Sequence, residues 1–291
     1  MSQSAYQPLV SIITPVYNGA AYLEDLILSV KAQDYPQIEH LILDDGSQDE
    51  GATVKILERY PHLRWWTRKN RGQYATMNEG LAAAHGEVIC FISADDLLAP
   101  GAVQAALDWL GEHPEAAGVY GFTQYQTESG ERLSIKRLVR SAPIQYYPYF
   151  AQVQHCSLYL RTAFIQAQQL TFNPDIKFVA DYDWMLRIVK TRANLGFLKR
   201  PLAIIRVHGE QTSSLNRQAM NTAQFQVARK HGYGGLKFTF YLNLLHVLIL
   251  SEQIWDAFQK NGLRGALGTL TSFWKNKLFP ALRRRFSKNQ A

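Results

Sequence analysis

Short apolar runs that alternate with helical patterns constrain the fold of this chain more than any other feature of its sequence. In the first 110 residues, apolar runs cover 9–14, 39–43, 63–67 and 88–92, and helical patterns follow at 21–32, 54–60, 73–85 and 101–110. Pro15 is expected to end the first run. Strands that alternate with helices predict an α/β fold with a mostly parallel sheet. Further along, residues 118–127 and 203–207 are predicted strands, and residues 178–190 form a predicted helix.

Polar residues follow three of these predicted strands. The segments are Pro15-Val16-Tyr17-Asn18-Gly19, Asp44-Asp45-Gly46-Ser47 and Ser93-Ala94-Asp95-Asp96. The carboxyl ends of parallel strands meet at one edge of a sheet, where α/β proteins bind their ligands. Carboxylates at that edge predict a site for Mg²⁺ or Mn²⁺, which take oxygen ligands and keep several waters and substrate phosphates. The alternative is that Asp96 caps the next helix.

The first two of these loops suggest a nucleotide site. Tyr17 can offer an aromatic face to a base, and Asp45 can accept hydrogen bonds from a base imide or a ribose hydroxyl. The alternatives are a turn whose Tyr17 packs on the sheet and a simple Asx turn at Asp44. The sequence contains neither GxGxxG nor GxxxxGK[ST]. A bound nucleotide diphosphate would therefore need a metal to hold its phosphates, which links Asp95 to these loops.

Two carboxylates open the predicted helix in the second half of the chain. Asp183 can pair with Arg187 one turn later, and the helix macrodipole favours both carboxylates. Asp181 has Met185 at the same spacing, so it has no helical cation and is free to act as a general base. His208 follows the last predicted strand and is a metal ligand, a phosphate donor or simply polar surface.

The positive charge of the chain is concentrated in its last segment. The net charge is +7, yet residues 229–291 hold eleven Lys and Arg against Glu252 and Asp256, which gives +9 there and −2 for residues 1–228. A basic tail with apolar helical segments predicts contact with an anionic membrane surface. The alternative is packing on the catalytic domain or on a partner subunit. Residues 238–250 are too few to cross a bilayer.

Sequence motifs that this chain lacks bear on its expected partners and cellular compartment. The tail carries no nucleic-acid-binding motif, so nucleic acid is not an expected partner. Cys90 and Cys156 provide neither a disulfide framework nor zinc-ligand spacing, and residues 1–8 lack the features of a secretory signal. We expect a cytoplasmic protein that attaches peripherally to the inner face of the cell membrane if its tail binds lipid.

Five motifs in this order resemble family 2 glycosyltransferases of the GT-A fold. They are residues 10–18, 43–47, 71–73 with 77–80, 86–87 leading to 93–96, and 180–183. The resemblance covers about residues 9–215. It implies a Rossmann-like, mixed and mostly parallel sheet flanked by helices. It also implies an inverting transfer of a sugar from a nucleotide diphosphate, usually UDP, with Mg²⁺ or Mn²⁺ bridging the diphosphate.

The resemblance also implies which residues bind the donor. Pro15, Tyr17 and Asp45 match positions that hold the nucleoside. The residues placed beside them in the donor site are Asn18, Arg71, Gln73 and Asp96.

The same resemblance implies the metal ligands and the base. Asp95 matches the last aspartate of the DXD motif, which binds the metal, and Asp181 matches the catalytic base. His208, in an Arg-x-His pattern, looks like a late histidine near the diphosphate and is taken as a second metal ligand. The sequence departs from the family at Ser93, where DXD has its first aspartate, and at Ala180, where a glutamate usually precedes the base.

These observations predict three segments. Residues 1–100 form a nucleotide-sugar-binding half, residues 101–215 an acceptor-binding and catalytic-base half of the same domain, and residues 216–291 a helical, basic C-terminal extension. The expected acceptor is a glycan or a lipid-linked molecule in polysaccharide or envelope glycan synthesis. His155 and the aromatic segment 146–150 are candidate acceptor contacts.

Two other function classes are alternatives to the glycosyltransferase. A noncatalytic nucleotide-sugar binding module would keep the donor site without turnover, and Ser93 and Ala180 leave this class open. A sugar-nucleotide pyrophosphorylase would need a glycine-rich, basic loop after the first strand. Residues 14–19 contain no Lys or Arg, which argues against this class.

Overall fold

The computed structural model describes residues 7–133, 144–151 and 153–273. The chain folds into two compact units. The first consists of residues 1–135 and 143–234, and the second includes residues 235–291. The first unit contains every residue predicted for the donor, metal and base sites.

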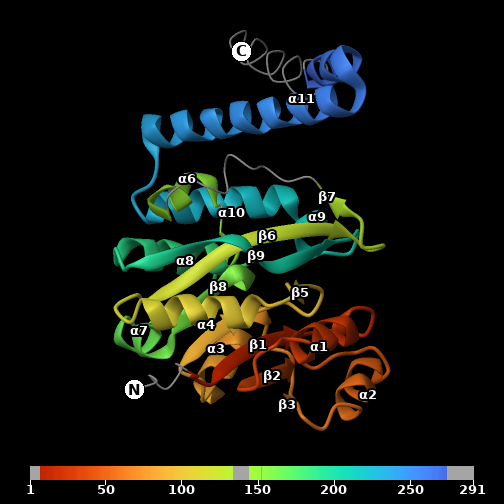
Figure 1. Cartoon of the computed structure of the whole chain (residues 1–291), viewed down its shortest axis with the longest axis vertical. Coiled ribbons are helices and arrows are strands. Elements are labelled where there is room, and N and C mark those ends of the chain that lie inside the picture. The colour runs from red at the N-terminus through yellow and green to blue at the C-terminus, as the bar shows by residue number, and fades with distance from the viewer. Residues whose placement is uncertain (1–6, 134–143, 152, 274–291) are drawn as a thin grey trace. The chain divides into compact units, whose positions relative to one another are not determined.

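A mixed sheet forms the centre of the first unit (Figure 1). Its strands are β1 (Val10–Val16), β2 (Ile38–Asp44), β3 (Arg64–Thr67), β4 (Val88–Phe91), β5 (Leu97–Leu98), β6 (Gly118–Thr127), β7 (Arg132–Leu133), β8 (Leu158–Arg161) and β9 (Leu195–Val207). They lie in the order β3-β2-β1-β4-β8-β6-β9-β5, and β7 pairs with β6. Strands β1 to β4 are parallel, as are β6 and β9, whereas β8 runs antiparallel to both of its neighbours. The predicted mixed, mostly parallel sheet is confirmed.

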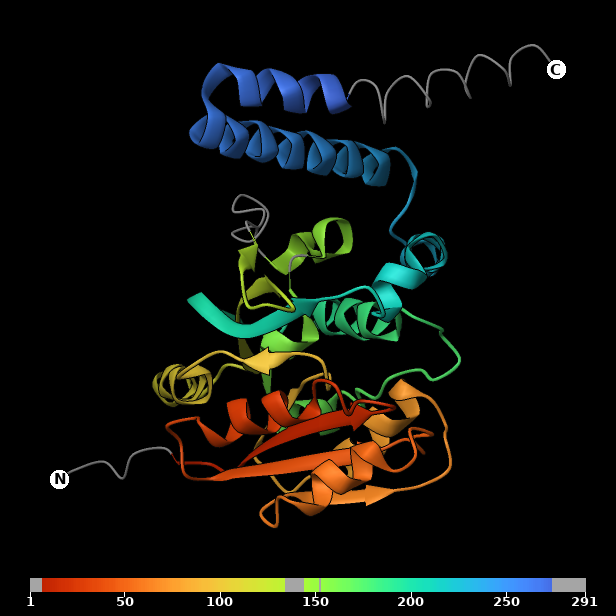
Figure 2. The same cartoon turned by 90° about the vertical axis from the view of Figure 1, so that its right-hand side faces the viewer.

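Helices cover both faces of the parallel strands (Figure 2). The helices of the first unit are α1 (Leu23–Lys31), α2 (Ala52–Glu58), α3 (Gln73–Ala83), α4 (Ala102–Glu112), α6 (Tyr147–Phe150), α7 (Thr162–Ala167), α8 (Ala180–Lys190), α9 (Thr212–Leu215) and α10 (Arg217–Lys230), with the short 3₁₀ helices η1 (Ile144–Tyr146) and η2 (His155–Ser157). Helix α1 buries Leu23, Leu26, Ile27 and Val30, which share one helical face. This spacing explains why α1 packs on the sheet.

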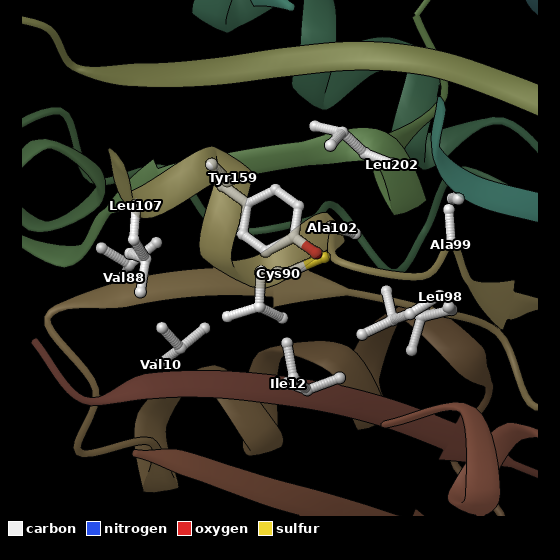
Figure 3. Packing of buried hydrophobic residues seen from close by; sticks show 14 of the residues in the cluster. Val10, Ile12, Val88, Cys90, Leu98, Ala99, Ala102, Leu107, Tyr159 and Leu202 are labelled. Carbon is white, nitrogen blue, oxygen red and sulfur yellow. The ribbon is translucent and has the colours of Figure 1, made fainter. Parts of the chain in front are cut away.

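Alternate residues of β1 enter the cores on the two faces of the sheet. Val10 and Ile12 join a cluster with Cys90 of β4 and Tyr159 of β8, which Figure 3 shows together with residues of α4. On the opposite face α3 approaches so closely that a Cβ on Gly80 would lie 2.4 Å from Ile13 Cγ2. Because β1 is buried on both faces, its sequence is a continuous apolar run rather than an alternating one.

The prediction that Pro15 ends the first strand is wrong, because β1 continues to Val16. The pairing of β1 with β4 stops at Ile13, whereas pairing with β2 continues to Val16. On the β2 side, the Val16 carbonyl accepts the N–H of Asp45 at 2.8 Å, so the ring nitrogen of Pro15 faces the side without a partner strand. A proline is tolerated where no ladder hydrogen bond is lost.

The second half of the sheet was predicted less completely. The predicted strand 203–207 is only the end of β9, which begins at Leu195. Lys199-Arg200-Pro201 interrupts the apolar pattern, and the register with β6 shifts between Gly121 and Thr123, so the strand continues through an irregularity. Strands β5 and β8 were not predicted, because runs of two and four residues carry little periodic signal.

The first unit continues beyond residue 215, where the catalytic half was predicted to end. Helix α10 belongs to this unit and buries Val227 and Ala228. Near the end of α10, His231 Nε2 lies 2.7 Å from Asp183 Oδ1 of α8. Helix α10 is therefore attached to the helix that carries the predicted base.

The second unit contains the helical segment α11 (Gly235–Phe273). Non-helical backbone angles at Asn261 and Gly262 divide it into two helices, residues 235–260 and 263–273. None of the helices in the part of the chain that the structure describes is long and apolar enough to cross a membrane.

Candidate active site

Hydrogen bonds join the loops that follow β1 and β2. The N–H of Asn18 donates to Ser47 Oγ at 2.8 Å, and the N–H of Gln48 donates to Asn18 Oδ1 at 2.7 Å. Asn18 has a φ of +50°, which an asparagine tolerates better than most residues. Tyr17 beside it is 47% exposed, whereas Pro15 is buried in β1. The ring of Tyr17 is therefore accessible to a ligand at the carboxyl edge of the sheet.

The two aspartates at the end of β2 have different surroundings. Asp44 accepts hydrogen bonds from Ser47 Oγ and Thr67 Oγ1, both at 2.5 Å. Asp45 accepts the N–H groups of Arg71 and Gly72, both at 2.8 Å, and also pairs with Arg68. Both carboxylates are buried. Asp44 thus holds the end of the strand together, and Asp45 fixes the loop that leads into α3.

Arg68 is a residue of this site that was not predicted from the sequence. Its Nε donates to Glu79 Oε2 at 2.5 Å, and its Nη1 donates to Asp45. Burial alone would lower the pKa of Arg68, but its hydrogen bonds to Glu79 and Asp45 raise the pKa instead. A signal was present in the sequence, since a cation directly follows the third strand at the edge where the loop aspartates gather.

Arg71 and Gln73 lie at the start of α3, next to the backbone that Asp45 holds. Both side chains are exposed, and Arg71 Nη1 lies 3.9 Å from Glu79 Oε2. The preceding Gly72 has a φ of +88°, a conformation that favours glycine. The turn therefore leaves both predicted donor-binding side chains open to solvent at the sheet edge.

The loop after β4 meets the end of β9. His208 Nε2 lies 3.2 Å from Asp95 Oδ2, although the two residues are 113 positions apart. The His208 side chain is 6% exposed and that of Asp95 is 30% exposed. The two residues predicted as metal ligands are thus brought together, with the carboxylate more open than the imidazole.

Asp96 points into the protein rather than toward solvent. It is 6% exposed, and its Oδ1 accepts the N–H of Arg206 at 3.3 Å. Burial, with the nearby charge of Asp95, raises the pKa of Asp96 well above its usual range. Asp96 therefore holds β9 beside the loop that carries Asp95, and it makes no capping hydrogen bond to α4.

A second layer of side chains supports His208. Its ring packs on Tyr22 of α1 with 4.5 Å between the centroids, and the guanidinium of Arg206 lies 4.9 Å from the centroid of the same tyrosine. Arg206 Nη1 also donates to Asp25 Oδ2 at 2.9 Å. Tyr22 was not predicted from the sequence, because only the fold brings α1 next to the end of β9.

Asp95 and His208 fit a divalent cation that binds few protein groups. Among the described residues no cluster of three or more His, Cys, Asp or Glu could hold a metal, so the chain offers these two donors. Mg²⁺ and Mn²⁺ commonly complete their coordination with water and substrate phosphate. His208 Nδ1 is buried without a hydrogen-bond partner in the part of the chain described, which leaves Nε2 as the nitrogen facing Asp95.

Asp181 lies at the start of α8, where it contacts two distant elements. Tyr74 Oη of α3 donates to Asp181 Oδ1 at 3.2 Å, and His155 Nδ1 of η2 lies 3.5 Å from Oδ2. Asp181 keeps 30% of its side chain exposed. Burial, followed by the charge of Asp181, raises the pKa of Tyr74, so its hydroxyl remains a donor. The carboxylate is thus oriented by the protein and still reachable from outside.

Asp183 has a structural environment, as the i, i+4 spacing predicted. It accepts a hydrogen bond from Arg187 Nε at 3.0 Å and contacts His231 Nε2 at 2.7 Å. Its side chain is 9% exposed. Of the two aspartates that open α8, only Asp181 remains available for chemistry.

Helix η2 lies near both Asp181 and the loop that carries Asp95. His155 contacts Asp181, and the next residue, Cys156, has its thiol pKa raised by burial and then by the charges of Asp96 and Asp95. The β1 loop reaches the same region, because a Cβ on Gly19 would lie 3.5 Å from that of Ala94. The loops after β1 and β4 therefore lie close together, and η2 lies beside Asp181.

Comparison with known proteins identifies the family. The profile described as glycosyl transferase family 2 matches residues 11–167, more than half of the chain. The chain belongs to glycosyl transferase family 2. An uncharacterized glycosyltransferase of Rickettsia conorii is 31% identical over 216 residues, which cover 72% of this chain and 35% of that protein. The chain thus spans about a third of the length of this family member.

A further relative and two solved structures are also similar to this chain, and the structures show its fold. The minor teichoic acid biosynthesis protein GgaB of Bacillus subtilis is 24% identical over 87% of this chain and 28% of its own length. TarS of S. aureus, solved with UDP-GlcNAc, has a TM-score of 0.61 at 18% identity and covers 91% of this chain and 80% of its own. The mannosyltransferase PcManGT of Pyrobaculum calidifontis, solved with GDP-Man and Mn²⁺, has a TM-score of 0.61 at 19% identity. It covers 95% of this chain and 83% of its own. The GT-A fold expected from the sequence is confirmed.

Proposed function

We propose that this family 2 enzyme is an inverting glycosyltransferase that moves a sugar from a nucleotide diphosphate, UDP in the first instance, to an acceptor hydroxyl. The observation that carries the proposal is that Asp181 is held by Tyr74 and still partly exposed, in the same unit in which Asp95 and His208 meet. An inverting transfer needs one base on the acceptor side of the anomeric carbon, opposite the diphosphate, and no covalent intermediate.

The donor is proposed to bind across the ends of β1, β2 and β4. Tyr17 offers its exposed ring to the base, while Pro15 and Asn18 shape the loop that carries it. Asp45 has three protein donors, and a carboxylate accepts about four hydrogen bonds, which leaves room for one from a base or ribose. TarS was solved with UDP-GlcNAc and PcManGT with GDP-Man, so a panel of donors is the appropriate test.

The remaining donor contacts concern the diphosphate. Arg71 and Gln73, both exposed beside the Asp45 loop, are proposed to reach it, and Asp96 holds the edge of β9 in place. Asp95 and His208 would hold Mg²⁺ or Mn²⁺, and the imidazole in this donor set favours Mn²⁺, because Mg²⁺ prefers oxygen. When bound, such an ion would neutralise charge on the leaving diphosphate.

The transfer step follows from the position of Asp181. Its carboxylate takes the proton of the acceptor hydroxyl as that oxygen bonds to the anomeric carbon. The bond from this carbon to the diphosphate breaks with its electron pair leaving on the diphosphate oxygen. Attack from the face opposite the diphosphate inverts the anomeric configuration. Tyr74 holds Oδ1 of the base by a hydrogen bond during this step.

The acceptor is proposed to be a glycan or a lipid-linked molecule used in polysaccharide or envelope glycan synthesis. A groove of about 920 Å³ runs between residues 175–178, which directly precede α8, and helices α9 and α10. Lys177, Gln226 and Lys230 are among its lining residues, so it suits a hydroxyl-rich and anionic chain. Lys177→Ala is expected to raise KM for the acceptor and to leave KM for the donor unchanged; the opposite pattern would exclude the groove.

Turnover of the donor distinguishes a glycosyltransferase from a noncatalytic nucleotide-sugar binding module. The purified protein is incubated with UDP- and GDP-sugars and Mn²⁺, and thermal stabilisation and release of the nucleoside diphosphate are followed. A donor that stabilises the protein and is also turned over supports the enzyme. Stabilisation without any release, with acceptor glycans present, would favour the module. The anomeric configuration of the product, read by NMR, then tests inversion.

Membrane contact is proposed for the second unit. Phe240, Val247, Trp255 and Phe258 of α11 are 41–62% exposed, and at 100° per residue they fall within about 80° of one helical face. Residues 229–291 carry a charge of +9, and each basic residue near an anionic leaflet contributes about 1 kcal/mol. An apolar face with aromatic residues on a basic segment is typical of helices that lie on membranes.

Flotation with anionic liposomes tests this contact. The double variant Phe240→Ser, Trp255→Ser is expected to lose flotation that the wild-type protein shows. Leu28→Ser, which changes an apolar side chain of α1 that is 46% exposed, is the matched control and should float normally. Equal flotation of all three proteins would reject the apolar face as the membrane contact and favour packing of the tail on protein.

A further inference from the structure

Asp181, the proposed base, is in contact with a tyrosine that fixes one of its two carboxylate oxygens. Tyr74 of α3 lies at the start of α8, where the backbone N–H groups of Ala180 and Asp181 act to lower the pKa that burial raises. Its own proton is directed to Asp181 Oδ1 at 3.2 Å. The tyrosine ring is also stacked on Phe172, with 5.9 Å between the centroids. Tyr74 therefore occupies one carboxylate oxygen, and the other oxygen, Oδ2, is left for the proton of the acceptor.

The free oxygen of Asp181 faces His155. Nδ1 of His155 lies 3.5 Å from Oδ2, and its side chain is 13% exposed. Neither ring nitrogen has a hydrogen-bond partner among the described residues. A buried imidazole normally uses at least one nitrogen in a hydrogen bond. The unused Nδ1 beside the base is what a proton acceptor needs, provided that the ring carries its own proton on Nε2.

We infer that Tyr74 and His155 are positioning and proton-relay residues for Asp181, with Tyr74 selecting Oδ2 as the basic oxygen and His155 returning that oxygen to its charged form. The inference rests on the proposed function. It assigns roles to two residues that the five sequence motifs do not cover.

The relay balances in protons and charge. The acceptor hydroxyl gives its proton to Asp181 Oδ2 as its oxygen bonds to the anomeric carbon, and the diphosphate leaves with the electron pair. The neutral carboxylic acid then passes the proton to His155 Nδ1, which forms a carboxylate and an imidazolium. The imidazolium releases its proton to solvent, and Asp181 is ready for the next acceptor.

Few other titratable groups face Asp181. They come from three elements packed against the start of α8: Tyr74 from α3, Tyr147 from α6 and His155 from η2. Tyr147 is buried and Tyr74 is half-buried, and burial raises the pKa of each, so they keep their protons. Of the groups that the described chain places at Asp181, the histidine is the one whose neutral side chain can accept a proton on a ring nitrogen.

The test compares His155→Gln with the wild-type protein over about pH 5.5 to 8. Glutamine keeps a polar side chain but cannot take a proton. We expect kcat to fall on the order of tenfold, less than the 10²–10⁴ contributed by a primary base, with donor KM unchanged. In the wild-type protein kcat should decline toward acidic pH, because a protonated imidazole cannot take the proton from Asp181, and this decline should be absent in His155→Gln. His113→Gln, whose ring stacks on Trp109, is the matched control and should keep the decline.

Two further variants distinguish loss of the proton relay from loss of folding. His155→Ala should regain activity when imidazole is added, which a merely structural role would not allow. Tyr74→Phe keeps the ring stacked on Phe172 and should lower kcat about tenfold without changing donor binding. A wild-type pH profile in His155→Gln, or no rescue of His155→Ala by imidazole, would overturn the relay. If Asp181→Asn retained full activity instead, the proposed function itself would fail.

Discussion

Acid should destabilise the first unit through His40, a buried histidine of β2. His40 is 4% exposed, its Nε2 lies 3.2 Å from Thr14 Oγ1 of β1, and its Nδ1 has no hydrogen-bond partner in the described chain. Burial, followed by the charge of His62, lowers the pKa of His40 to about 3. An unfolded histidine has a pKa of about 6.5, so below this pH the unfolded chain binds a proton that the folded chain excludes.

The size of the effect follows from proton linkage. Above about pH 6.5 His40 is neutral in both states and the free energy of unfolding does not depend on its ionisation. Between about pH 6.5 and 3 this free energy falls by about 1.4 kcal/mol per pH unit, which gives about 2 kcal/mol at pH 5. Because a domain is stable by only about 5–15 kcal/mol, this loss is large enough to measure.

Urea unfolding at about pH 7.5 and 5 measures the effect in the wild-type protein and in His40→Leu. Carboxylates contribute equally to both proteins, so the difference between their pH dependences isolates His40. The wild-type protein should lose about 2 kcal/mol more than His40→Leu over this range, and His113→Gln should behave like the wild-type protein. Parallel losses in wild type and His40→Leu would refute the reasoning. Activity below about pH 6 must also be corrected for the unfolded fraction.

Three other predictions concern the packing and the donor site. Gly80→Val should lower the free energy of unfolding by about 1–3 kcal/mol, because a Cβ there would lie 2.4 Å from Ile13 Cγ2; an unchanged urea midpoint would contradict the close approach. Asp95→Asn should abolish the Mn²⁺-dependent part of donor binding in calorimetry and leave the metal-free part intact, and retained Mn²⁺ dependence would exclude Asp95 as a ligand. Arg68→Gln should weaken donor binding about tenfold by releasing the Asp45 loop, so wild-type affinity would show that this ion pair is not needed.

Local sequence patterns were sufficient for the parallel half of the fold. Each strand from β1 to β4 is a short apolar run followed by a helix, so rhythm alone predicted the order and approximate bounds of these elements. The one error there, at Pro15, arose because the effect of a proline depends on which side of the strand has a partner. That partner is set by how far β4 extends, which no local pattern encodes.

The antiparallel half and the supporting residues of the site were harder to predict. Strand β8 is only four residues long, yet its insertion between β4 and β6 brings η2, and with it His155, to Asp181. Tyr74 and Asp181 are 107 positions apart, and their contact depends on how α3 and α8 meet. Asp95, Asp181 and His208 were found because they stand in motifs that resemble the family, whereas residues that act through a neighbour carry no such motif.

Asp181 is the residue on which the account depends most, and replacing it by asparagine is the most direct test. Asp181→Asn keeps the size of the side chain and the hydrogen bond from Tyr74 but removes the base. We expect sugar transfer to fall by about 10²–10⁴ while calorimetry with donor and Mn²⁺ gives wild-type affinity. Asp108→Asn, a change at an exposed carboxylate of α4 outside the donor site and the acceptor groove, should transfer normally. Wild-type transfer by Asp181→Asn would contradict the assignment of the base.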